Sequence, residues 1–447
     1  MQALKCSSLF SYETSSEESG DEENGSDASD DSDDEVSMEK RALSRAGSKD
    51  AEDQLPPEKI MLLVMLCMFQ GYAAMVGPLQ QKFKAELHIG QVGDRAQAFT
   101  QAAVFVHYGK FVARLGHNVF LGCFSTMDRV YIAMALMFIG TIVPPLFVFA
   151  YGSQWVGTVF ISYGLSGIGL GVFECTFLSV ITPLGKLTKA WAIMGAPLGF
   201  GTICILGQLC MAYKMPVEYL YWYIALCIPV GMLVFKMHAP SDKEQRSGGS
   251  NMQASLCSSL MDCSAWLPAI LPNIVAKVIV NFVMENVTPV NYYTYNAPVV
   301  PLLGPTSESP LLNRDIFFAL VSVFILTGDT ISRRVPASLP LETYFMNVVF
   351  LTAAGVCSIV GFSLEMLAIA VVTLIAIFMA FWGNGLVYGI SAKYIDRFVP
   401  EEHNLAAYSV WCFFGDAGAI AGGSLVDVVR NRICGDHEYH FECRLHN

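Results

Sequence analysis

The residues in this sequence best suited to chemistry are charged side chains inside long apolar runs. Glu174 lies in the run GLGVFECTFLSVITPLG, and Asp329 and Arg333 lie four residues apart in LTGDTISRR. A spacing of four places two side chains on one face of a helix, within reach of each other. A charge at the centre of a bilayer costs about 3 kcal/mol on insertion scales. Such residues therefore predict a polar interior between helices.

Three further charges share this setting. Lys277 and Glu285 are eight residues apart in IVAKVIVNFVMENVTPV, and Asp416 follows two aromatic residues in FFGDAGAIAGG. Eight residues are about two helical turns, so Lys277 and Glu285 share a similar face. For these three, structural ion pairing between helices is the favoured interpretation, and a role as coupling or cavity charges is the alternative. For the charges named above, structural ion pairing is the alternative to a functional role.

The elements that must position these residues are membrane-spanning helices. The chain has 447 residues, of which 53% are hydrophobic and 15% charged. Soluble domains carry about 25% charged residues. This deficit predicts a polytopic membrane protein and argues against a collagen, a disulfide scaffold or a nucleic-acid-binding protein.

Eleven apolar runs reach the roughly 20 residues that a helix needs to cross a bilayer. They lie at about 60–80, 98–123, 130–151, 155–182, 189–212, 218–236, 264–290, 315–332, 342–362, 365–390 and 403–428. The predicted fold class is an all-α polytopic membrane protein of about 11 transmembrane helices in a six-plus-five arrangement. The predicted domains are a disordered acidic cytoplasmic tail (1–57), a six-helix bundle (58–236), a cytoplasmic linker (237–262), a five-helix bundle (263–429) and an extracytoplasmic tail (430–447).

The negative charge of the protein is concentrated near its N-terminus. Residues 1–55 hold 16 acidic and 5 basic residues, whereas the remaining residues hold 23 and 22. The segment 13–35 is almost entirely Ser, Asp, Glu, Gly and Asn, a composition that cannot bury enough apolar surface to fold. We interpret it as a solvated spacer, with acid-directed kinases that act on its serines as the alternative partners.

The loop charges predict an orientation. With the N-terminus in the cytoplasm, ten Lys and Arg fall in cytoplasmic loops and five in the opposite loops, as the positive-inside rule requires. Eleven spans then place the C-terminus outside. Cys434 and Cys443 close a short polar loop there, where a disulfide is plausible. A metal site on His437 and His440 is the less favoured interpretation, and we predict no bound metal.

Nothing in the sequence predicts catalysis. The glycine-rich stretch 164–171 lies inside an apolar run without a preceding strand, so it does not match a nucleotide-binding loop. No ATP-binding motif and no catalytic constellation stand out. We therefore expect neither an enzyme nor a cofactor.

Several stretches, taken in order, resemble the equilibrative nucleoside transporter family. The run 171–178 (GVFECTFL) is similar to the fourth span of that family, with Glu174 where Gln is usual. Asp329 and Arg333 match the Asp and Arg of its eighth span, although Ser332 replaces the usual Gly. The triplet around Asn384 (GNG) resembles S-N-G of the tenth span. The Pro-Trp-Asn of the first span is missing.

The resemblance implies a major-facilitator-like bundle that moves nucleosides or nucleobases by alternating access. It implies that Glu174, Asp329, Arg333 and Asn384 bind the substrate, and that Glu174 could also carry a proton. The protein would be a multi-pass component of the lipid bilayer, in the plasma membrane rather than an organelle. Two alternatives stay open: a major facilitator for another small polar solute, and a non-transporting receptor or scaffold that uses the acidic tail.

Overall fold

The structure is a computed structural model that describes residues 56–76, 79–89, 94–240, 263–295, 297–304, 308–400, 403–426, 428–429 and 432–433. The predicted acidic tail up to residue 55, the predicted disulfide, the alternative metal site, and the predicted linker beyond residue 240 lie outside these residues.

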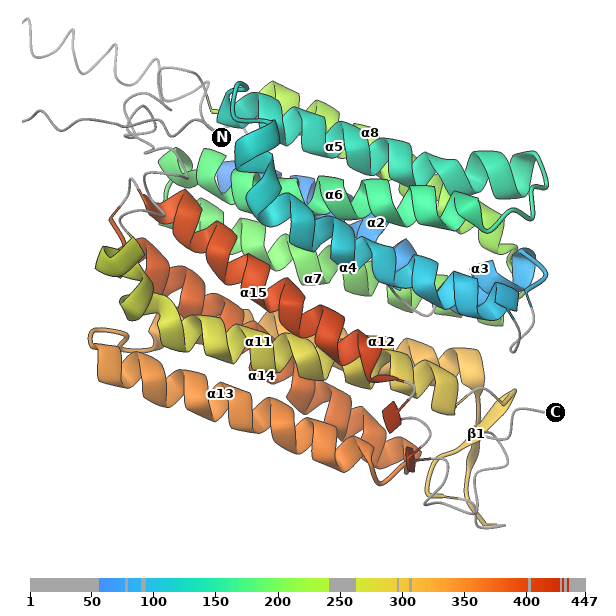
Figure 1. Ribbon diagram of the computed structural model, residues 1–447. Coiled ribbons are helices and arrows are strands. Elements are labelled where there is room, and N and C mark those ends of the chain that lie inside the picture. Colours follow the sequence, from blue (N-terminus) through green and yellow to red (C-terminus); the bar gives the residue numbers. More distant parts are fainter. Residues whose placement is uncertain are drawn as a thin grey trace, which may run out of the picture. The chain divides into compact units, whose positions relative to one another are not determined.

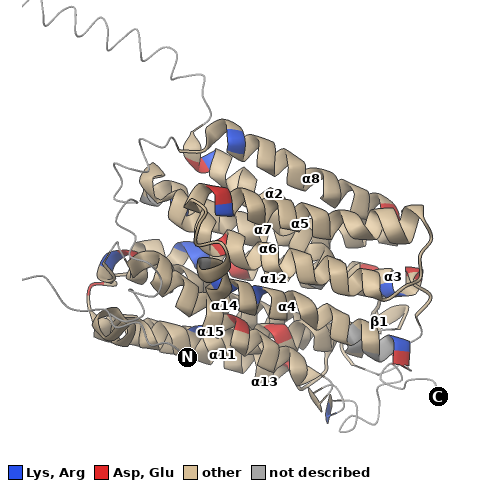
Figure 2. Cartoon of the chain, turned by 45° about the horizontal axis from the view of Figure 1, so that its top comes forward, with Lys and Arg blue, Asp and Glu red and all other residues tan. Residues whose placement is uncertain are grey.

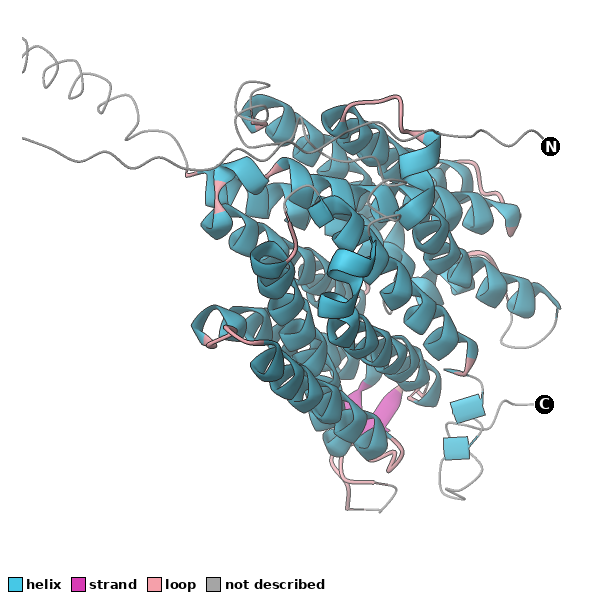
Figure 3. Ribbon diagram, turned by 60° about the vertical axis from the view of Figure 1, so that its left-hand side comes forward, coloured by secondary structure: helices cyan, strands magenta, loops and turns pink. Residues whose placement is uncertain are grey.

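The described chain is almost entirely helical (Figure 3), which confirms the predicted fold class. The helices of the first half are α2 (Pro57–Val76), the short α3 (Leu79–Glu86), α4 (Asp94–Phe120), α5 (Thr126–Val143), α6 (Gly157–Val180), α7 (Lys186–Ala212) and α8 (Val217–His238). Those of the second half are α11 (Cys263–Thr294), α12 (Arg314–Ser338), α13 (Tyr344–Glu365), α14 (Ala370–Phe398) and α15 (Asn404–Ser424). An antiparallel pair, β1 (Val299–Pro301) and β2 (Leu311–Asn313), joins α11 to α12.

Ten of these helices are long and apolar enough to cross a membrane. The long helix α4 is not among them, because Gln101, His107, Lys110 and Arg114 interrupt its apolar run. The first apolar run, predicted to continue to residue 80, ends as a helix at Val76 and is followed by α3.

Pro144 and Pro145 turn the end of α5 into the π-helical segment η1 (Pro144–Ala150), as proline interrupts α-helical hydrogen bonding.

Local sequence fixes where several helices begin. The side chain of Ser125 accepts a hydrogen bond from the amide of Asp128 at the start of α5, and Thr343 does the same for Met346 at the start of α13. Asn313 accepts two amide hydrogen bonds at the start of α12. These caps satisfy backbone donors that have no partner inside the helix.

The helices pack in two groups (Figure 1), which we call the N-terminal group (α2–α8) and the C-terminal group (α11–α15). The groups meet where α7 packs against α12 and α4 packs against α15. Within each group, helices approach closely at small residues. A Cβ atom at Gly199 or Gly422 would collide with a backbone carbonyl of the adjacent helix, α2 or α11 respectively. The domain boundaries given above stay predictions.

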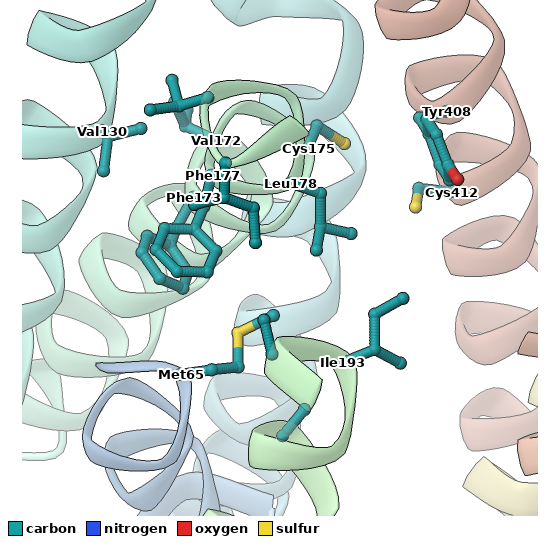
Figure 4. Packing of buried hydrophobic residues seen from close by; sticks show 14 of the residues in the cluster. Met65, Val130, Val172, Phe173, Cys175, Phe177, Leu178, Ile193, Tyr408 and Cys412 are labelled. Atoms are coloured by element: carbon teal, nitrogen blue, oxygen red, sulfur yellow. The ribbon is translucent and has the colours of Figure 1, made fainter. Parts of the chain in front are cut away.

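The two ends of the bundle are packed differently. At the linker end, where α8 ends and α11 begins, one apolar core includes residues of both groups, from Met65 and Phe177 to Tyr408 and Trp411. Figure 4 shows part of this core, with side chains from α2, α5, α6, α7 and α15. At the hairpin end, where β1 and β2 lie, the two groups have separate buried cores, and the partly buried Phe200 of α7 packs against both. The groups are therefore joined by apolar packing mainly at the linker end.

Candidate functional site

A cavity lies between the two helix groups. Its volume is about 120 Å³, enough for on the order of ten waters or one small solute. Its lining includes aromatic side chains and eight charged ones, which come from both groups: Lys110, Arg114, Glu174, Lys277, Glu285, Asp329, Arg333 and Asp416. Figure 2 shows charged positions midway along helices that are otherwise mostly uncharged.

Arg114 is the centre of the charges on the α4 side. Its Nε donates to Asp416 Oδ2 at 2.9 Å, and one terminal nitrogen donates to Glu174 Oε2. The other terminal nitrogen donates to the carbonyl of Gly171 at 3.1 Å. The side chain is 3% exposed, so these charge-assisted bonds are shielded from water. The guanidinium thus joins a carboxylate of each helix group.

A second polar chain begins one turn earlier on α4. Lys110 Nζ lies 3.4 Å from Asp416 Oδ1 and donates to the hydroxyl of Tyr72 at 3.4 Å. Tyr72 in turn donates to Glu285 Oε1 at 3.3 Å, and His107 Nε2 lies 3.4 Å from the other carboxylate oxygen. Glu285 of α11 is therefore held by residues of α2 and α4.

On the C-terminal side, α12 and α14 place a compact polar cluster against the cavity. Arg333 donates to both carboxylate oxygens of Asp329, at 3.2 and 2.8 Å. Asn384 donates its amide to Asp329 Oδ1 at 3.1 Å and accepts from Lys277 Nζ at 3.3 Å. The i, i+4 pair predicted from the sequence is thus a bidentate ion pair, which fixes the guanidinium plane.

Tyr388 connects the two sides. Its hydroxyl donates to Glu174 Oε1 at 3.1 Å, and its ring lies under the Arg333 guanidinium at 4.2 Å and near Lys277 Nζ at 5.0 Å. Cation–π contacts of this kind hold a cation without neutralising it.

Other contacts close the linker end. Lys189 of α7 lies 2.8 Å from Asp396 of α14, and Tyr408 of α15 donates to the same carboxylate at 3.0 Å. The Arg334 guanidinium of α12 lies 4.0 Å from the ring of Trp191 on α7. At the hairpin end an ion pair joins α3 to α12 at 3.3 Å.

The structure brings all seven predicted charged or polar site residues into this one cavity: Glu174, Lys277, Glu285, Asp329, Arg333, Asn384 and Asp416. Their assigned roles stay predictions. The sequence analysis missed Lys110, Arg114 and the two tyrosines. Lys110 and Arg114 are also spaced by four inside an apolar run, so the rule that identified Asp329 and Arg333 would have found them.

Among the described residues, no group of three or more His, Cys, Asp or Glu could hold a metal.

Comparison with known proteins shows a fold but no sequence family. No family model and no curated protein matches the chain. A POT family transporter in complex with 5-aminolevulinic acid superposes with a TM-score of 0.58 at 12% identity, over 84% of this chain and 92% of that one. The human organic anion transporter MFSD10 gives 0.56 at 13% identity, over 86% and 95%.

A D-xylose–proton symporter gives a TM-score of 0.54 at 14% identity, over 87% of this chain and 98% of that one. These three structures share with our chain a helical bundle of nearly the same extent. At such low identity the likeness shows the fold alone. The chain therefore has the helical-bundle fold that these three transporter structures share.

Proposed function

We propose that this protein is a membrane transporter that carries a small polar solute by alternating access. The observation that supports this most directly is the cavity between the two helix groups, with charged residues from both groups in its wall. Charges inside membrane helices are costly and mark solute or ion pathways. A scaffold that acts through a cytoplasmic tail would not need such a cavity.

The solute that we propose is a nucleoside or a nucleobase. The cavity has four cationic and four anionic side chains when His107 is neutral, so an uncharged solute enters without an unbalanced charge. Aromatic side chains, among them Phe69, Tyr72, Phe200 and Phe381, offer faces on which a flat ring can stack. The carboxylates and cations supply acceptors and donors for the ring edge.

The uneven packing of the two ends supports a closed linker end. The shared apolar core and the Lys189–Asp396 ion pair join the groups there. We propose that the linker end faces the cytoplasm, that transport requires these contacts to separate, and that the polar contacts across the cavity exchange as the groups rock. The Glu285 carboxylate, shared by Tyr72 and His107, is the group that we propose for proton coupling, together with Glu174.

Uptake into proteoliposomes tests the proposal. The full chain should accumulate labelled hypoxanthine, uracil, adenosine or uridine in a saturable manner, first at equal pH on both sides and then with an imposed proton gradient. Asp329→Asn removes the bidentate partner of Arg333 and should reduce uptake by at least tenfold, whereas the exposed Lys236→Met should not. Absence of uptake of every nucleoside and nucleobase by folded protein would contradict the substrate class.

A further inference from the structure

Lys277 differs from the other cations of the cavity. Lys110, Arg114 and Arg333 each lie within 3.4 Å of a carboxylate oxygen. Lys277 makes no such ion pair with any residue that the structure describes. A lysine that is 7% exposed and lacks an anionic partner is costly in an apolar protein. A buried ammonium without an anionic partner therefore points to a ligand in the cavity that binds to its charge.

The surroundings of Lys277 hold the ammonium without neutralising it. Its Nζ donates to Asn384 Oδ1 at 3.3 Å and lies 5.0 Å from the ring of Tyr388 and 5.2 Å from that of Trp411. Trp411 is itself fixed, because its indole N–H donates to the carbonyl of Asn273 at 3.2 Å. An ammonium has three N–H donors, and among the described residues Asn384 takes one of them. The others remain for a solute in the cavity.

The charges of the cavity are also unevenly divided. On the α4 side three carboxylates, Glu174, Glu285 and Asp416, face two cations. In the cluster around Asn384, where α11, α12 and α14 meet, one carboxylate, Asp329, lies with Arg333 and Lys277. With His107 neutral, the α4 side therefore has one excess negative charge and this cluster has one excess positive charge. A solute with an acceptor end and a donor end is oriented by this field, with its acceptor end at Lys277.

We propose that Lys277 determines specificity by donating to the ring carbonyl of an oxo-nucleobase, of the hypoxanthine or uracil type. This inference rests on the proposed function and names the group of the substrate that Lys277 recognises. Lysine has no acceptor, so a C–H or an amino group in place of the carbonyl leaves the N–H that points at that position unpaired. Sites built to hydrogen-bond a substrate group discriminate strongly against analogues that lack it.

The test compares hypoxanthine with purine, which has the same rings without the oxygen. Dissociation constants of both are measured by calorimetry on the full chain in detergent, for the wild type and for Lys277→Met, Lys277→Gln and Lys277→Arg. The wild type should prefer hypoxanthine by about 10- to 100-fold, the range expected for a hydrogen bond to a charged group. Lys277→Met should bring the ratio close to one, and Lys277→Arg should keep most of it.

The ratio is measured on one protein sample at a time, so a change in folded fraction does not alter it. Lys277→Gln, which keeps one amide donor, should give an intermediate ratio and supplies the readout if the methionine variant does not fold. Lys236→Met, an exposed lysine of α8, is the matched control and should leave the ratio unchanged. Equal affinity of the wild type for both ligands, or an unchanged ratio in Lys277→Met and Lys277→Gln, would overturn this inference but not the proposed function. A wild type that binds no nucleobase or nucleoside would overturn the proposed substrate class as well.

Discussion

Replacing Arg114 by Met should destabilise the protein more than any single change to the carboxylates that it binds. The guanidinium donates to Asp416 on α15 and to Glu174 on α6, and it also satisfies the carbonyl of Gly171. Methionine has a similar length and no donor, so packing is largely kept while these hydrogen bonds are lost.

The magnitude follows from what the change leaves behind. Each charge-assisted hydrogen bond contributes about 1.5–3 kcal/mol, and removal of one partner of a buried ion pair typically costs about 3–5 kcal/mol because the other charge stays buried. Asp416 keeps a second cation, since Lys110 Nζ lies 3.4 Å away. Glu174 keeps only the neutral Tyr388 among its described hydrogen-bond partners. We therefore expect a loss of about 3–5 kcal/mol in the free energy of unfolding, most of it at Glu174.

A double-mutant cycle separates the two carboxylates. In the Arg114→Met background, Glu174→Gln should recover about 1–3 kcal/mol, because it removes the stranded charge, whereas Asp416→Asn should recover less than about 1 kcal/mol. The assay is urea unfolding in detergent micelles, followed by circular dichroism. Arg397→Met, an exposed arginine of α14, is the control and should change stability by less than about 0.5 kcal/mol. Wild-type stability of Arg114→Met, or equal recovery by the two carboxylate changes, would refute the reasoning.

Three further predictions concern packing and motion. Gly385→Ala should lower the free energy of unfolding by about 1–3 kcal/mol, since a Cβ would lie 2.5 Å from a backbone carbonyl of α12. A urea midpoint equal to that of the wild type would contradict this prediction. Cys175 of α6 and Cys412 of α15 are buried free cysteines on helices that pack across the two groups (Figure 4), so oxidation with diamide should form a disulfide that stops uptake, reductant should restore it, and Cys412→Ser should be insensitive. Lys189→Met removes the 2.8 Å ion pair with Asp396 and should raise maleimide labelling of Cys412 severalfold; unchanged labelling would show that this pair does not keep the linker end closed.

The helical architecture follows from the sequence because lipid imposes a simple rule. A chain in the bilayer must satisfy its own backbone, so apolar runs of about 20 residues become helices. The predicted runs correspond to the eleven long helices of the described chain. The ends were less predictable. The run at 60–80 breaks at Val76, and the π-helical turn after Val143 depends on two prolines whose effect on helix geometry cannot be read from hydropathy.

The composition of the site was predictable, but its pairing was not. Asp329 and Arg333 are close in sequence, so their ion pair follows from helix geometry alone. Glu174 was expected to face the solute, yet Arg114, 60 residues earlier, already binds it. Lys277 and Glu285 share a helix face as expected, but their partners Asn384 and Tyr72 come from other helices. Contacts between distant helices depend on how the groups pack, which one sequence does not specify.

Helix α4, which supplies Lys110 and Arg114 to the cavity, is the long helix that hydropathy identifies least well. Lys110 and Arg114 would each cost about 3 kcal/mol if they faced lipid, and with Gln101 and His107 they keep α4 outside the set of ten strongly apolar helices. In the assembled bundle their charged ends bind Asp416 of α15 and Glu174 of α6, so the unfavourable side of α4 is covered from both groups. The stability of α4 in the membrane therefore depends on contacts among the residues that line the cavity. A conformational change that separates α4 from α15 must supply new partners for Lys110 and Arg114, and water or the solute in the cavity is the available source.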